Sequence, residues 1–116
     1  MSARDVTVSL RQMRDAASRA VEIARKLTRK ELQPDHVETL ALTRLLEILG
    51  EAARRVPEST RGENSRIPWR EIVGTRDRLI HGYDQVDLDV LWTIVADQLP
   101  ELIRQLDAVL ERHGRR

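Results

Sequence analysis

Apolar residues recur at steps of three and four through nearly the whole chain, and this spacing constrains the fold more than any other feature. Such spacing places apolar side chains on one face of an α-helix. The first set predicts a helix over residues 8–27. Its members are Leu10, Met13, Ala17, Val21, Ala24 and Leu27. No segment alternates apolar and polar residues as a half-buried strand does, so we predict an all-α fold.

A second helix is predicted over residues 34–56, after a connection over residues 28–34 that has room for one short turn. Pro34 suits the first helical turn, where its nitrogen needs no acceptor. Asp35 and Glu38 are favourable near the positive end of the helix dipole. The following residues, 57–66, are polar and without period, and they are predicted to form a loop.

Two more helices are predicted in the second half of the chain. Pro68 opens one over residues 68–81, and Gly82 suits a left-handed stop after it. Asp87 is the expected N-cap of the last helix. Pro100 lies inside that helix and should kink it, because its nitrogen cannot donate to the preceding turn. Four main helices with mostly short links predict an up-down bundle with a kinked C-terminal helix.

The composition narrows the class of protein. A chain of 116 residues fits a single domain, residues 1–116. It has no cysteine, and His36 and His113 have no second ligand at metal spacing, so we expect no metal site and no cofactor. The net charge of +1 excludes the strongly basic surface of a general nucleic-acid binder. No membrane span or signal peptide is evident, and we expect a cytoplasmic protein.

The chemistry is concentrated where Arg76, His81 and Tyr83 fall within eight residues. An imidazole moves protons near neutral pH, and a guanidinium holds a phosphate by paired hydrogen bonds. On one straight helix Arg76 and His81 would point about 140° apart. They can converge if the helix ends at His81, or if two copies of the motif meet across a two-fold axis. We favour both together, in a homodimer.

This pair of residues suits RNA cleavage without a metal ion. His81 would act as the acid or base that moves the proton of a ribose 2′-hydroxyl. Arg76 would stabilise charge on the phosphate in the transition state. In a dimer, two copies of His81 could share the roles of base and acid.

The same residues resemble a known family. The R-x4-H-x-Y pattern of Arg76, His81 and Tyr83 is that of HepT toxins, in the HEPN superfamily. Other segments resemble the family in order along the chain: residues 48–53 (ILGEAA), 67–74 (IPWREIVG) and 86–88 (VDL). The resemblance covers about residues 44–102.

The resemblance implies an all-helical fold that dimerises, with a composite ribonuclease cleft lined by Arg76 and His81. It also implies the toxin of a toxin–antitoxin pair, whose usual antitoxin is the small nucleotidyltransferase MntA. In the family MntA transfers AMP to the motif tyrosine, here Tyr83. Each added phosphate would compete with RNA for Arg76. Asp77 departs from the Asn that relatives commonly carry and adds a negative charge beside the site.

Other charged residues have candidate supporting roles. Arg70 and Arg78 could bind RNA phosphates or could simply be solvated, and Glu51 could orient an arginine of the cleft. A structural alternative for Arg76 is pairing with Asp77, Asp84 or Glu51.

The motif and the family resemblance together predict a metal-independent endoribonuclease toxin neutralised by AMPylation. The alternative is a non-catalytic HEPN-type module that binds a nucleotide or a nucleotidyltransferase.

Overall fold

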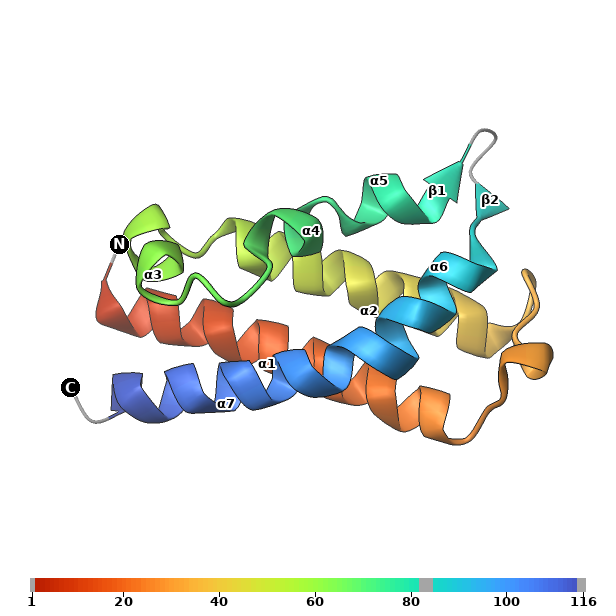
Figure 1. Ribbon diagram of the computed structural model, residues 1–116, viewed down its shortest axis with the longest axis horizontal. Helices are drawn as coiled ribbons and strands as arrows, with labels where there is room; N and C mark the ends of the chain where they lie inside the picture. The colour runs from red at the N-terminus through yellow and green to blue at the C-terminus, as the bar shows by residue number, and fades with distance from the viewer. Residues whose placement is uncertain (1, 82–84, 115–116) are drawn as a thin grey trace.

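Three long helical segments run along the molecule, and shorter elements lie along one edge (Figure 1). The computed structural model describes residues 2–81 and 85–114, and for residues 80, 81 and 85 it describes the backbone alone. The elements are α1 (Ala3–Arg25), the 3₁₀ helix η1 (Arg29–Glu31), α2 (Val37–Arg54), α3 (Glu58–Glu63), α4 (Trp69–Val73), α5 (Thr75–Leu79), β1 (Ile80–His81), β2 (Gln85–Val86), α6 (Leu88–Thr93), the π-helix η2 (Ile94–Gln98) and α7 (Leu99–Gly114).

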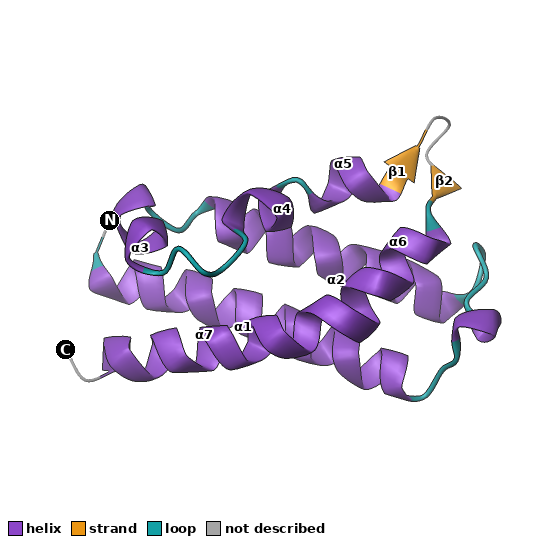
Figure 2. Ribbon diagram, viewed as in Figure 1, coloured by secondary structure: helices purple, strands orange, loops and turns teal. Residues whose placement is uncertain are grey.

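Most of the described residues are helical, and the two strands are only two residues each (Figure 2). The all-α prediction is confirmed, whereas the expectation of no strand was wrong for this short hairpin. Both described ends of the chain lie at one end of the molecule, and the hairpin lies at the other (Figure 1). The molecule measures 44 × 28 × 20 Å.

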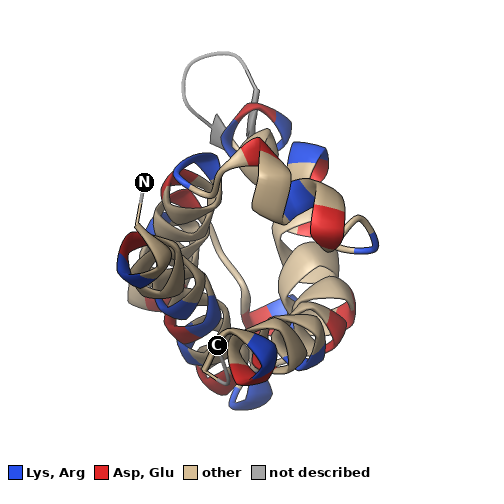
Figure 3. Cartoon of the chain, turned by 90° about the vertical axis from the view of Figure 1, so that its left-hand side faces the viewer, with Lys and Arg blue, Asp and Glu red and all other residues tan. Residues whose placement is uncertain are grey.

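The core lies between α1, α2 and the continuous segment α6–η2–α7. Its largest fully buried side chains are Leu10, Met13, Leu32, Leu42, Leu46, Leu49, Leu79, Leu91, Leu106, Val56, Val95 and Thr39. Burying one such aliphatic side chain contributes about 1.5–3 kcal/mol to folding. Residues of both charge signs are mixed around the outside of the bundle, as the net charge of +1 predicts (Figure 3).

The first helix begins at Ala3, five residues before the predicted start at Val8. Ser2 is its N-cap: the Ser2 hydroxyl accepts from the Asp5 N–H (3.2 Å), and the Asp5 carboxylate accepts from the Ser2 N–H (3.3 Å). This capping box satisfies two backbone donors that a helix end leaves open. The apolar period predicted the helix, whereas the polar cap sets where it starts.

The second helix begins at Val37, three residues later than predicted from Pro34. The Gln33 carbonyl is already used, because it accepts from the His36 N–H (3.2 Å) and from the Thr39 hydroxyl. A helix beginning at Pro34 would need that carbonyl for the Val37 N–H. A tight turn therefore occupies the segment that the sequence placed in the first helical turn.

Residues 57–66 contain the six-residue helix α3, so the prediction of a plain loop was wrong. Polar residues give so short a helix no period to detect. Arg61 of α3 donates to three carbonyls at the end of α2, those of Ala53 (3.0 Å), Arg54 (3.0 Å) and Val56 (2.9 Å). Its guanidinium also lies 5.9 Å from the centre of the Trp69 ring. One arginine thus joins the end of α2 to α3 and α4.

The predicted third helix is broken into α4 and α5 and ends at Leu79, before His81. At the break the Thr75 hydroxyl donates to the Glu71 carbonyl (3.0 Å), which in a straight helix would accept the Thr75 N–H. Such bonds from Ser and Thr bend helices. Gly82, the predicted helix stop, lies outside the described residues.

The start and the irregularity of the last helix follow the prediction. The Asp87 side chain caps α6 by accepting from the N–H groups of Asp89 and Val90, at 3.1 Å each. The π-helix η2 comes directly before α7, whose second residue is Pro100. Since Pro100 has no N–H, the preceding turn widens, and the Leu99 N–H donates to Ile94, five residues back.

Candidate active site

The motif segment is held between two helices by its backbone. β1 follows α5 directly and pairs with β2 in antiparallel register, with His81 opposite Gln85. At the base of this hairpin the Asp87 N–H donates to the Leu79 carbonyl (2.7 Å). Because Asp87 also caps α6, the end of α5 and the start of α6 are fixed relative to each other. The backbone at His81 therefore lies on a braced hairpin.

Arg76 lies on α5 and lines a groove between α5 and α2 with a volume of about 330 Å³. Asp77 and Glu51, both candidates from the sequence, line the same groove. The structure therefore brings three of the predicted residues together from two elements. The full lining is Arg44, Leu46, Glu47, Gly50, Glu51, Arg54, Val73, Arg76 and Asp77.

Gly50 lets α2 approach α4 closely enough to form this groove. A Cβ atom at Gly50 would lie 3.1 Å from the Ile72 carbonyl oxygen and 3.7 Å from that of Val73. Both atoms are backbone and cannot move aside as a flexible side chain can. The glycine of the ILGEAA segment thus sets the distance between α2 and the chain that leads to Arg76.

The charges in the groove are balanced. Its three arginines and three carboxylates come from Arg44, Arg54, Arg76, Glu47, Glu51 and Asp77. Arg44 pairs with Glu47 on its own helix, at 3.6 Å. Arg76 is exposed and forms no ion pair or hydrogen bond through its side chain with any residue that the structure describes. The pairing of Arg76 with Asp77 or Glu51 is therefore absent, and its five N–H donors remain available.

The other predicted residues lie apart from this groove or beyond what is described. Arg70 is exposed on α4, and Arg78 is half-buried on α5; neither lines the groove. Tyr83 lies outside the described residues, as does Asp84, so Tyr83 as a modification site stays a prediction. His81 has left the helix, so the angle of about 140° expected for an ideal helix does not apply to it.

Sequence reasoning missed Arg44, Glu47 and Arg54 as neighbours of Arg76. A signal was present, because with Glu51 they follow helical steps of three and four along α2. This polar face borders the apolar face that predicted the helix. The spacing marks these residues as one face of α2, and the contact with α4 and α5 makes that face the wall of a groove.

Among the residues that the structure describes there is no cluster suited to a metal ion and no helix suited to crossing a membrane. No three or more His, Cys, Asp or Glu side chains there are grouped so that they could hold a metal ion. In the same ranges, none of the helices has the length and apolar character that crossing a membrane requires.

The chain is similar to a known ribonuclease family over the segments that form this groove. A family model described as "Ribonuclease HepT-like" matches residues 13–109. The chain belongs to this HepT-like ribonuclease family. The match includes Arg76, His81 and Tyr83 together with the α2 wall of the groove, and it confirms the resemblance found in the sequence. No solved structure gives a significant match to the chain.

Named relatives support the same family. A protein called "Putative RNase" from Caldanaerobacter subterraneus subsp. tengcongensis is 36% identical over 79% of this chain and 82% of its own length. One of the same description from Methanocaldococcus jannaschii is 33% identical over 94% of this chain and the whole of its own. A "Probable ribonuclease HepT" from Thermococcus cleftensis is 36% identical over 80% of this chain and 84% of its own.

Proposed function

We propose that this HepT-like protein is a metal-independent endoribonuclease that acts as a homodimeric toxin in the cytoplasm. The observation that supports the proposal is Arg76, an exposed arginine with no described partner, in a groove lined by α5, the helix directly before the strand that bears His81. Cleavage of a phosphodiester requires a cation that can hold the phosphate together with an acid–base residue, and Arg76 and His81 are proposed for these two roles. Membership of a ribonuclease family supports the same chemistry.

In the proposed reaction, His81 of one protomer removes the proton of a ribose 2′-hydroxyl. The 2′-oxygen attacks the adjacent phosphorus, and the bond from phosphorus to the 5′-oxygen breaks. His81 of the second protomer, in its protonated form, gives a proton to that leaving oxygen. The products are a 2′,3′-cyclic phosphate and a 5′-hydroxyl. Arg76 stabilises the added negative charge on the phosphate oxygens.

The direct test is cleavage of total cellular RNA by the purified protein in the presence of a chelator. Wild type is expected to cleave and to leave cyclic-phosphate or 3′-phosphate ends, whereas His81→Ala and Arg76→Ala should not. Arg11→Gln is the matched control, because Arg11 is an exposed arginine on α1 outside the groove. Equal cleavage by wild type and His81→Ala would refute the proposal.

Regulation by a nucleotidyltransferase is the second part of the proposal. An MntA-like partner would transfer AMP to Tyr83, and the added phosphates would occupy Arg76 in place of RNA. Co-expression with an active partner should raise the mass of the chain in steps of one AMP unit. Tyr83→Phe should abolish that increase. An unchanged mass in wild type would contradict this regulation.

The balanced charge of the groove favours one alternative, a non-catalytic module that binds a nucleotide or a nucleotidyltransferase. Asp77 and Glu51 would weaken the hold of such a groove on a polyanionic RNA. Growth arrest on expression of the chain alone separates the two functions. Arrest that His81→Ala abolishes supports the ribonuclease, and no arrest with unmodified Tyr83 supports the binding module.

A further inference from the structure

Another groove lies between α1 and the segment α6–η2–α7. Its volume of about 550 Å³ is within the range of sites that hold small ligands. Eight of its ten lining residues are apolar and the other two are arginines: Val21, Ala24, Arg25, Leu27, Trp92, Val95, Ala96, Pro100, Ile103 and Arg104. The widened π-helical turn η2 forms part of its wall.

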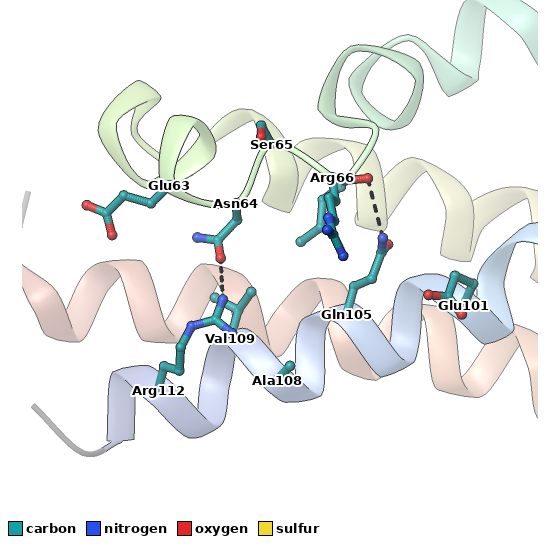
Figure 4. A pocket seen from close by; sticks show the side chains of 10 residues that line it. Glu63, Asn64, Ser65, Arg66, Glu101, Gln105, Ala108, Val109 and Arg112 are labelled. Carbon is teal, nitrogen blue, oxygen red and sulfur yellow. Dashed lines mark hydrogen bonds between the residues drawn. The ribbon is translucent and has the colours of Figure 1, made fainter.

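The charge of this groove differs from that of its neighbours. Arg25 and Arg104 line it, and no carboxylate does. Each of four other grooves on the described surface includes at least one Asp or Glu, as Glu63 and Glu101 do in the groove of Figure 4. Each arginine is bonded to a glutamate one turn away, Arg25 to Glu22 (3.2 Å) and Arg104 to Glu101 (2.7 Å). Those glutamates lie outside the groove lining.

These exposed ion pairs leave the arginines able to bind an anion. The side chains of Arg25 and Arg104 are 71% and 69% exposed, and pairs of this kind contribute about 0–1 kcal/mol. Each guanidinium has five N–H donors, of which the glutamate uses one or two. The groove therefore presents two cations from different helices at the edge of an apolar surface.

The two tryptophans of the chain are bonded differently. Trp69 is buried, and its indole N–H donates to the Asn64 carbonyl (3.1 Å). Trp92 is half-buried in the groove, and its indole N–H donates to no residue that the structure describes. Every buried side-chain nitrogen among the described residues has a hydrogen-bond partner. Because the indole N–H of Trp92 has none, that group is not buried and reaches solvent. Trp69 has a structural role, whereas Trp92 keeps a donor and a ring for a ligand.

We propose that this groove binds an unpaired nucleotide of single-stranded RNA, with the base against Trp92 and the phosphate at Arg25 and Arg104. The apolar wall accepts the flat base, the free indole N–H matches a ring acceptor, and each guanidinium has N–H donors for phosphate oxygens. Only the N-cap Asp87 lies between β2 and α6, so Trp92 comes six positions after Val86 of the hairpin. The inference rests on the proposed function in that RNA is taken as the substrate.

The test is binding of a 2′-O-methyl hexa-adenylate, which has no free 2′-hydroxyl and so cannot be cleaved by the proposed reaction. Binding is measured by anisotropy of a labelled oligomer and by quenching of tryptophan fluorescence. We expect quenching in wild type and its loss in Trp92→Phe, which retains Trp69. The double variant Arg25→Gln/Arg104→Gln should raise Kd about tenfold. Its binding should also depend less on salt, so the slope of log association constant against log salt concentration should become about 0.7 less negative.

The controls decide what occupies the groove. Arg11→Gln should bind as wild type, and the double variant should keep the helical circular dichroism of wild type, because both arginines are exposed. Adenosine 5′-monophosphate and laurate are titrated in parallel. Quenching by the mononucleotide without binding of the oligomer, or displacement of the oligomer by laurate alone, would overturn the assignment to RNA. So would an oligomer Kd that the double variant leaves unchanged.

Failure of this inference is distinguishable from failure of the ribonuclease proposal. If wild type cleaves RNA while the double variant binds the oligomer normally, the groove assignment alone is wrong. If the oligomer binds through Trp92 and both arginines while no RNA is cleaved, the catalytic proposal alone is wrong. The same double variant in the cleavage assay should raise KM and leave kcat close to that of wild type.

Discussion

At the scale of single residues, two arginines illustrate opposite uses of one side chain. Arg61 donates to carbonyls at the end of α2, and its guanidinium carbon lies over the Trp69 ring. Arg76 is exposed and bonds to nothing in the described ranges through its side chain. The first pattern stabilises the fold, and the second leaves a charge ready for a ligand.

Replacing Arg61 should therefore lower stability. Arg61→Ala is expected to lower the free energy of unfolding by about 2 kcal/mol, because three carbonyls lose their charged donor. Arg61→Lys should recover only part of this loss, since a lysine lacks the planar fork. Urea denaturation measures both. Arg55→Ala is the control and should change stability by less than about 0.5 kcal/mol, because Arg55 is exposed.

Arg76 should show the reverse behaviour. Arg76→Ala is expected to leave the free energy of unfolding, measured by urea denaturation, within about 0.5 kcal/mol of wild type, because no described partner is lost. Its RNA cleavage should fall about 100-fold or more, as when a group that stabilises transition-state charge is removed. A large loss of stability together with lost cleavage would instead favour the structural role for Arg76.

At the scale of elements, close contact between α2 and α4 sets the position of the groove. The backbone carbonyl of Ile72 would lie 3.1 Å from a Cβ atom at position 50. α5 continues from α4, so any shift of α4 away from α2 would carry Arg76 with it. The distance between α2 and α4 thus depends on the absence of a side chain at Gly50.

A pair of glycine substitutions tests this contact. Gly50→Leu should lower stability by about 1–3 kcal/mol, because a large side chain forced into a packed contact moves the backbone. Gly62→Ala should instead raise stability by up to about 1 kcal/mol, since a Cβ atom at Gly62 meets nothing within 4 Å. Thermal unfolding of the two variants gives the comparison. Equal shifts would show that the α2–α4 contact is loose.

The sequence predicted the long elements better than the short ones. An apolar period is a strong signal over twenty residues, so α1, α2 and the last helical segment were found, and Asp87 was correctly identified as a cap. α3 has five polar residues and a glycine, and at the break the Thr75 hydroxyl is bonded to the Glu71 carbonyl. Neither leaves a periodic trace. Side-chain hydrogen bonds determine these features, and they exist only once the chain has folded.

The sequence was sufficient to name some residues of the candidate site, but not all the residues that surround Arg76. Arg76, Asp77 and Glu51 were named from the sequence, and they line one groove. Arg44 and Arg54 entered only with the structure, because the approach of α5 to α2 depends on Gly50. The roles of His81 and Tyr83 remain predictions, which the cleavage and mass measurements test.

At the scale of the whole molecule, stability depends on one aliphatic core shared by the three long segments. Leu106→Ala should lower the free energy of unfolding by about 2–5 kcal/mol, because Leu106 is fully buried and leaves a cavity. Leu40→Ala deletes the same atoms from a side chain that is 60% exposed and should change stability by less than about 0.5 kcal/mol. Chemical denaturation of both variants checks the difference.

The separation of the described chain ends from the hairpin has a practical consequence for the proposed dimer. A fluorescent donor or acceptor attached at Ser2 lies far from the motif along a 44 Å axis. If two protomers meet at their hairpin ends, the two dyes lie apart by up to about twice that length, and energy transfer is weak. If they pack side by side and parallel, the dyes lie close together and transfer is strong. A mixture of singly labelled chains would thus report how the two copies are oriented, without a label near the proposed catalytic residues.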